Sequence, residues 1–175
     1  MKLRTIAALS ILAAASAFVA AGCSNTPTSP TNPYQVKFTA RLLPANEVPP
    51  ITDAEASGFG VVTITLDLTK DSAGTVTGAT ATFDLQLTGF PANTPINVAH
   101  IHEGAATCVC PVVVSTTLGA GQVTLTDGSG TFAKSGINVN AANAQGIVNT
   151  PGNYYFNVHS TLHPSGVARG PLEKQ

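Results

Sequence analysis

The chain has four histidines, and two of them, His100 and His102, stand two positions apart, a spacing that lets both imidazoles reach one metal ion. On an extended strand alternate side chains leave the same face, with their Cα atoms roughly 6.5 Å apart. His159, on another expected strand, would complete a three-histidine site of the kind that zinc or copper accepts, and His163 is a candidate fourth ligand. Two other interpretations stay open: a structural cluster hydrogen-bonded to backbone or carboxylate groups, and a catalytic role without a metal.

Cys108 and Cys110 form a C-x-C pair shortly after these histidines. Thiols of an exported chain tend to oxidise, so a disulfide between the two is expected. On a fully extended strand their Cα atoms would stand near the upper end of the separation that a disulfide bridges, so a relaxed bond needs a tighter backbone. The alternatives are thiols that supplement the histidines as soft copper or zinc ligands, and unreactive thiols.

The elements that must position these residues are strands, because the apolar pattern from Tyr34 onward has a period of two rather than 3.6. Turn-forming residues separate the alternating stretches. The expected strands are 36–42, 62–68, 79–87, 96–102, 111–118, 122–126, 130–134, 153–160 and 167–172, and the stretch 138–147 could hold a short helix. About nine strands at this spacing predict an all-β fold, a two-sheet antiparallel sandwich with Greek-key crossing, formed by one domain over residues 34–175.

Residues 1–22 are typical of a secretory signal peptide. Lys2 and Arg4 come first, and an uninterrupted run of apolar and small residues follows to position 21. The run is at or below the length that spans a bilayer, so a permanent membrane helix is the weaker interpretation.

The end of this leader, Ala20-Ala21-Gly22-Cys23, resembles the bacterial lipobox, in which the signal is cut before a cysteine whose sulfur is then lipidated. Residues 23–33 would be the lipidated Cys23 and a tether rich in Pro and Thr. We therefore expect a protein of the cell envelope, anchored to a membrane by lipid and facing outside the cytoplasm. Ser24 resembles the residue that permits outer-membrane sorting in cells with two membranes. Ordinary cleavage near Ala21, which gives a freely secreted protein, is the alternative.

Four separated stretches, in order, resemble the chordin-type (CHRD) domain. They are Phe38-Thr39-Ala40-Arg41-Leu42-Leu43 with Asn46-Glu47-Val48-Pro49-Pro50, then Ala99-His100-Ile101-His102-Glu103-Gly104, then Tyr155-Phe156-Asn157-Val158-His159-Ser160, and Gly166-Val167-Ala168-Arg169-Gly170-Pro171-Leu172. The resemblance implies an exported β-sandwich, found in bacterial surface proteins and in animal extracellular antagonists of growth factors. It implies no settled activity.

Three charged residues within these stretches are expected to pair. A lone Arg169 in an apolar sandwich would be costly, so we expect a structural ion pair with Glu47 or Glu103. Glu103 is also the expected carboxylate that orients a metal ligand. A substrate-binding arginine is the alternative for Arg169.

Composition restricts the function. Charged residues make up 10% of the chain and the formal net charge is −1, which disfavours nucleic-acid binding. Walker, GxSxG and HExxH motifs are absent, so an enzyme is the weaker expectation. The first hypothesis is a non-catalytic binding or structural module whose protein or small-molecule partner is unknown. The second is a protein with a single copper or zinc site, at which redox chemistry is an option. His100 and His102 are similar to the His-x-His strand of copper/zinc superoxide dismutases, but four histidines are too few for a binuclear dismutase site.

Overall fold

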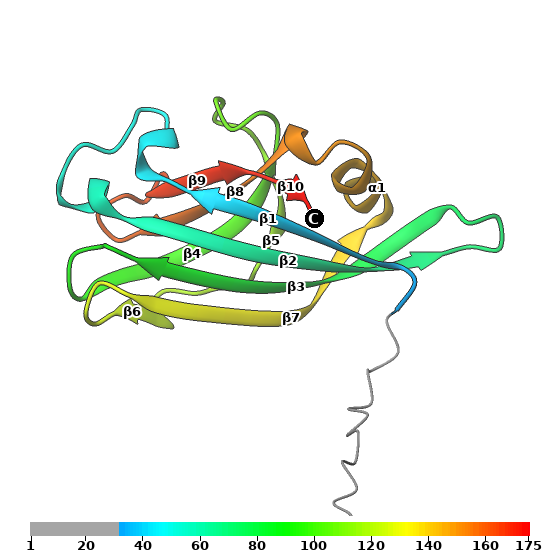
Figure 1. Cartoon of the computed structure of the whole chain (residues 1–175), viewed down its shortest axis with the longest axis horizontal. Coiled ribbons are helices and arrows are strands. Elements are labelled where there is room, and N and C mark those ends of the chain that lie inside the picture. Colours follow the sequence, from blue (N-terminus) through cyan, green and yellow to red (C-terminus); the bar gives the residue numbers. More distant parts are fainter. Residues whose placement is uncertain (1–31) are drawn as a thin grey trace, which may run out of the picture. The chain divides into compact units, whose positions relative to one another are not determined.

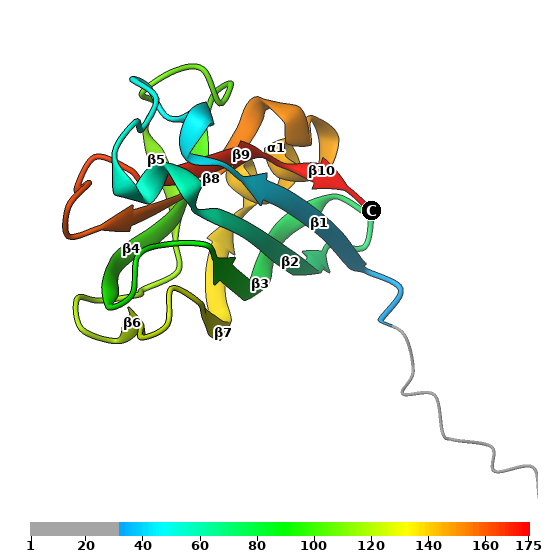
Figure 2. The same cartoon turned by 60° about the vertical axis from the view of Figure 1, so that its left-hand side comes forward.

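The computed structural model describes residues 32–175, and these residues form two antiparallel sheets that face each other (Figures 1 and 2). The signal peptide, Cys23 and most of the expected tether lie outside the described residues. The first sheet has the order β10-β1-β2-β3-β7, and the second has the order β5-β4-β8-β9, with β6 also paired to β4. The all-β two-sheet sandwich is therefore confirmed.

Ten strands and one α-helix make up the elements of the described chain, together with three short 3-10 helices. The first sheet contains β1 (Gln35–Leu42), β2 (Phe59–Lys70), β3 (Val76–Thr88), β7 (Gly130–Asn140) and β10 (Glu173–Lys174). The second contains β4 (Thr94–Glu103), β5 (Val112–Ser115), β6 (Val123–Leu125), β8 (Tyr154–Ser160) and β9 (Ala168–Pro171). The helices are η1 (Pro44–Asn46), η2 (Ala54–Ser57), α1 (Ala141–Asn149) and η3 (Pro151–Asn153).

The first sheet follows directly from the alternating pattern. Phe38 on β1 is paired with Ile64 on β2, which is paired with Phe83 on β3, and all three side chains are fully buried. Along each strand, the buried residues alternate with partly exposed ones, so one face of this sheet covers the core and the other contacts solvent. Each buried aliphatic or aromatic side chain contributes about 1.5–3 kcal/mol relative to exposure. Phe83 meets Phe156 of the second sheet across the core, at a ring-centroid distance of 5.9 Å.

Strand β7 is longer than the expected stretch 130–134, and the reason is a bulge. Opposite β3 the register shifts between the pairs Ala81–Ile137 and Phe83–Lys134. Gly136 lies in this bulge with φ of 75°, a left-handed conformation that glycine adopts without strain. The bulge breaks the period of two, so the pattern in the sequence stops before the strand does. The helix α1 begins three residues later than the range 138–147, where the Asn140 side chain accepts a hydrogen bond from the backbone N–H of Asn143 at 2.9 Å.

The second sheet is covered on both faces. All seven residues of β8 are buried, and alternate side chains belong to the core and to a polar layer on the opposite face. Loops 43–58, 104–111 and 161–167 cover this polar layer, because their groups contact side chains of β8 and β9 there. In this respect β8 differs from β2 and β3 of the first sheet, each of which has one partly exposed face.

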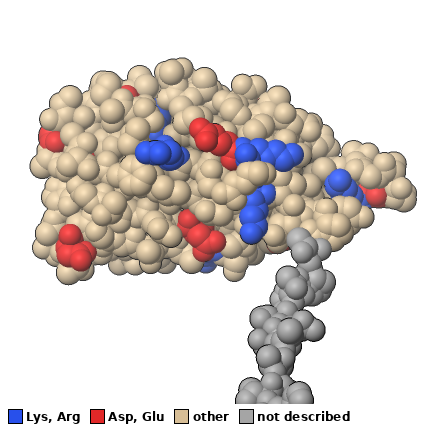
Figure 3. Space-filling view, in the orientation of Figure 1, with Lys and Arg blue, Asp and Glu red and all other residues tan. Residues whose placement is uncertain are grey.

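The surface has few charges. On the face drawn in Figure 3, the acidic and basic side chains are sparse and scattered among neutral residues. No helix in residues 32–175 has the length and apolar character needed to cross a membrane.

Candidate metal centre

Strand pairing brings the three candidate ligands together on the polar face of the second sheet. On β4, His100 and His102 leave the same face, and β8 runs antiparallel beside them, with His159 opposite Val98. The ring centroids of His100 lie 4.5 Å from those of both His102 and His159. One ligand atom from each ring lies within 4.8 Å of those of the other two. Their exposed fractions are 9%, 7% and 8% for His100, His102 and His159.

Backbone carbonyls determine which ring nitrogens carry protons. The Nδ1 of His102 lies 2.6 Å from the Cys110 carbonyl oxygen, and the Nδ1 of His159 lies 2.9 Å from that of Pro164. A carbonyl oxygen only accepts, so both Nδ1 atoms carry the proton and donate it. The Nε2 atoms of these two neutral histidines are therefore unprotonated and carry a lone pair. The Nε2 of His102 is buried and has no hydrogen-bond partner.

The third histidine completes the arrangement. The Nε2 atoms of His100 and His159 lie 2.9 Å apart. Because Nε2 of His159 is an acceptor, Nε2 of His100 donates in the metal-free state. Moving that proton to Nδ1 of His100 would expose its Nε2 lone pair, so that each of the three rings would offer an Nε2 ligand to one ion without any net loss of protons.

All three imidazoles are held in the neutral form. Burial, with a further contribution from His159 and His102, lowers the pKa of His100 to about 3. Burial also lowers the pKa values of His102 and His159, and the nearby Arg169 guanidinium adds to the effect. The hydrogen bonds to the two carbonyls act in the opposite direction and are weaker. Neutral imidazole is the form that binds a metal.

A stack of planar groups supports His102. Its ring lies on that of Tyr155, with centroids 4.5 Å apart and planes at 5°. The Arg169 guanidinium also lies over the Tyr155 ring, at 4.9 Å from its centroid. Arg169 in turn donates from Nε to Oε2 of Glu47 at 2.7 Å, and its Nη2 lies 2.6 Å from the same oxygen. Burial raises the pKa of Glu47, and the charge and hydrogen bonds of Arg169 oppose this. The ion pair therefore holds the guanidinium over the ring that supports His102.

Two candidate residues lie elsewhere. Glu103 does not pair with Arg169 and does not orient a histidine: it is exposed at the end of β4, where alternation turns it away from the face that carries His102. The expected ion pair of Arg169 thus forms with Glu47, the other expected partner. The predicted orienting role of Glu103 is wrong, because the backbone carbonyls of Cys110 and Pro164 orient His102 and His159. His163 is outside the cluster as well, because its Nε2 lies 2.9 Å from an Asp53 carboxylate oxygen and 3.7 Å from one of Glu55.

Cys108 and Cys110 form a disulfide with a Cα separation of 5.4 Å. The two residues lie in the loop between β4 and β5, and β5 starts at Val112, one residue after the expected position 111. Their Cα separation is shorter than the roughly 6.5 Å of an extended chain, so the backbone between them is bent at Val109.

The donor set fits a borderline metal ion. Tetrahedral bonds of about 2.0–2.1 Å would place ligand atoms about 3.4 Å apart. The observed separations range from 2.9 Å to at most 4.8 Å, so ring movements of about an ångström close the set around an ion. Imidazole suits copper and zinc, and three protein ligands leave a position for water or a small ligand.

A sequence model of the CHRD domain matches residues 38–172, which include every member of the cluster. The chain belongs to the CHRD domain family. Among curated proteins and among solved structures, nothing matches the chain. The family resemblance found in the sequence is therefore confirmed.

The stretches that resemble the CHRD domain meet at this cluster. Strands β4, β8 and β9 are neighbours in one sheet, and the ion pair joins Glu47 of the first stretch to Arg169 of the last. Leu43 and Arg169 also form a β-bridge that links the edges of the two sheets. In this CHRD domain the separated motifs thus build one polar layer.

Sequence reasoning missed two members of this layer. Tyr155 and Asn157 share the face of His159, and both are almost fully buried. The signal was present, because the three polar or amphipathic side chains follow each other at every second position of one strand. What the sequence lacked was any sign that loops would cover that face.

Proposed function

We propose that this protein is an exported, lipid-anchored CHRD-domain module that binds a single copper or zinc ion through His100, His102 and His159. The observation that carries the proposal is the convergence of three neutral imidazoles, one of which has a buried Nε2 with no partner. A buried acceptor without a partner costs about 1–3 kcal/mol. A metal ion on that lone pair removes this cost.

The proposed role is binding rather than catalysis. Arg169 binds Oε2 of Glu47 and holds this carboxylate in an ion pair, and the backbone of the Cys108–Cys110 loop binds the Tyr155 hydroxyl. Both groups therefore have structural partners that compete with a role as acid or base on a bound molecule. The module would therefore hold or sequester an ion outside the cytoplasm.

The location rests on the N-terminal sequence. The basic Lys2 and Arg4, the apolar run and the lipobox-like end at Cys23 support export followed by lipidation. In cells given labelled fatty acid, wild type should incorporate label and stay with the membrane fraction. Cys23→Ser should lose the label and release the protein. Retention of the unlabelled wild type on the membrane would contradict the anchor.

Calorimetry on metal-stripped protein tests the ion site. Full chain carrying Cys23→Ser should bind one equivalent of Cu(II) or Zn(II). His159→Ala should weaken binding at least about 100-fold, since a ligand is lost. His163→Ala is the matched control, because this histidine is held by Asp53 outside the cluster. Absence of stoichiometric binding, or an equal loss in His163→Ala, would contradict the metal site.

A further inference from the structure

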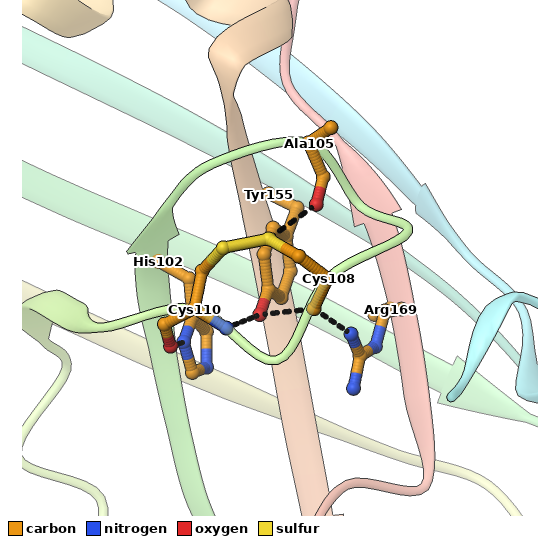
Figure 4. Close-up of a disulfide and its surroundings, with 6 residues drawn as sticks. All are labelled: His102, Ala105, Cys108, Cys110, Tyr155 and Arg169. Carbon is orange, nitrogen blue, oxygen red and sulfur yellow. Dashed lines mark hydrogen bonds between the residues drawn. A yellow bond between two sulfur atoms is a disulfide. The ribbon is translucent and has the colours of Figure 1, made fainter. Parts of the chain in front are cut away.

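The Cys108–Cys110 loop is fastened to the side chains that support the metal ligands (Figure 4). The Cys110 carbonyl accepts from Nδ1 of His102 at 2.6 Å, and the Cys110 N–H donates to the Tyr155 hydroxyl at 3.2 Å. The Cys108 carbonyl accepts from the Tyr155 hydroxyl at 3.0 Å and from Nη1 of Arg169 at 2.7 Å. Three backbone groups of a very short loop thus hold the three stacked side chains.

The disulfide fixes the positions of these backbone groups relative to one another. It closes a ring over Cys108, Val109 and Cys110, and so fixes the two carbonyls relative to each other. Its sulfur atoms also pack on Gly104, just after β4: a Cβ at this glycine would lie 2.7 Å from the Cys108 sulfur and closer still to the Cys110 sulfur. The bond therefore anchors the loop against the strand that carries His102.

We propose that the Cys108–Cys110 disulfide positions His102 for the metal ion, so that its reduction lowers metal affinity. The inference rests on the proposed metal-binding function. With the ring open, the Cys110 carbonyl is no longer held against Nδ1 of His102. The imidazole then loses the contact that fixes its tautomer and orientation. Loss of a group that orients a histidine ligand typically lowers metal affinity by about 10–100-fold.

The redox step is a thiol–disulfide exchange with an external dithiol. One thiolate of the dithiol attacks a cysteine sulfur, the S–S bond of the protein breaks, and a mixed disulfide forms. The second thiolate then attacks the dithiol sulfur of this mixed disulfide and displaces the protein cysteine. The protein gains two electrons and two protons as two thiols, and the dithiol becomes a disulfide. Both cysteines are partly exposed, and Val109 between them is 78% exposed, so the bond is open to such a reagent.

The test uses the full chain with Cys23→Ser, whose remaining cysteines are Cys108 and Cys110. Zn(II) affinity is measured by calorimetry on the oxidised protein and on the variant that also carries Cys108→Ser and Cys110→Ser. We expect the variant to bind about 10–100-fold more weakly. Val109→Ala, which keeps the disulfide and changes an exposed side chain, is the matched control and should bind as the parent does.

A second measurement separates positioning from general loosening. Nitrogen-15 NMR of the imidazoles reports which ring nitrogen is protonated. In the serine variant the Nδ1–H form of His102 should be lost, whereas His159, held by the Pro164 carbonyl, should keep it. A change at both histidines would indicate disruption of the whole layer and would overturn specific positioning.

The outcomes distinguish the two proposals. Equal Zn(II) affinity of the parent and the serine variant would overturn the role of the disulfide and leave the metal site intact. Tighter binding by freshly reduced parent would show that the thiols act as ligands, and would also overturn it. If the oxidised parent binds no Zn(II) or Cu(II), the proposed function fails, and the inference that rests on it fails as well.

Discussion

Replacing Glu47 with alanine should strongly destabilise the domain, because it leaves a buried guanidinium without its counter-charge. The side chains of Arg169 and Glu47 are 2% and 3% exposed. The substitution removes both short contacts to Oε2, at 2.7 and 2.6 Å. Arg169 keeps its hydrogen bond to the Cys108 carbonyl and its place over the Tyr155 ring.

The size of the effect follows from these contacts. Removing one partner of a buried ion pair costs about 3–5 kcal/mol. The contacts that Arg169 retains place the cost near the lower end, at about 3 kcal/mol. Domains of this kind are stable by only about 5–15 kcal/mol, so the loss is a large share. With a urea m-value of about 2 kcal/mol/M, the midpoint should fall by about 1.5 M.

Urea unfolding at pH 7, followed by far-UV circular dichroism, measures this change in the full chain with Cys23→Ser. Glu103→Ala is the control, since it removes an exposed carboxylate from the neighbouring strand and should change stability by less than about 0.5 kcal/mol. Glu47→Gln retains a hydrogen-bond acceptor for Arg169, so its loss of stability should lie between those of Glu47→Ala and Glu103→Ala. The reasoning is refuted if Glu47→Ala costs less than about 1 kcal/mol, or no more than Glu103→Ala.

Two further predictions concern pH and the backbone. The pKa of His100 is lowered to about 3, so the unfolded state takes up a proton near pH 6.5 that the folded state does not. The free energy of unfolding of metal-free protein should thus fall by about 2 kcal/mol from pH 6.5 to 5 through His100 alone, and urea midpoints that stay level over this range would contradict the buried neutral cluster. Gly166 has φ of 130°, and a Cβ there would lie 2.6 Å from Nδ2 of Asn157 and 2.7 Å from Oε2 of Glu47. Thermal melting of Gly166→Ala should therefore show that the free energy of unfolding falls by about 2 kcal/mol or more. Gly121→Ala is the control: Gly121 has φ of 80° and nothing within 4 Å of the added Cβ, so its free energy of unfolding should fall by only about 1 kcal/mol. Equal losses would show that crowding around Gly166 has no effect.

Most strands could be predicted because each needs only local information. In β2 and β3 the alternation of apolar and polar residues is uninterrupted, and it determines which side chains face the core. Where a bulge shifts the register of β7, or where β10 is only two residues long, the local pattern carries no signal. These elements depend on the neighbouring strand, which the sequence does not identify.

In the candidate site, too, only the features that depend on local sequence could be predicted. The spacing of His100 and His102 places both on one face of a strand, but only the pairing of β4 with β8 brings His159 to them. The choice between Glu47 and Glu103 as the partner of Arg169 depended on which loop covers the sheet. That is a long-range property, since Glu47 and Arg169 are 122 positions apart. The carbonyls of Cys110 and Pro164 could not be predicted at all, because every residue has one.

The composition of the polar layer narrows the kind of ion that fits it. The cluster offers three uncharged nitrogen ligands, and Arg169 engages Oε2 of the buried Glu47 carboxylate in the same polar layer. Hard ions such as Mg²⁺ and Ca²⁺ need charged or carbonyl oxygen ligands, so this donor set discriminates against them. Imidazole favours copper and zinc, and with equal geometry copper binds more tightly in the order of divalent metals. If the proposed site binds an ion, its selectivity thus comes from the three neutral nitrogen ligands, and the Glu47–Arg169 pair contributes to the stability of the layer that holds them.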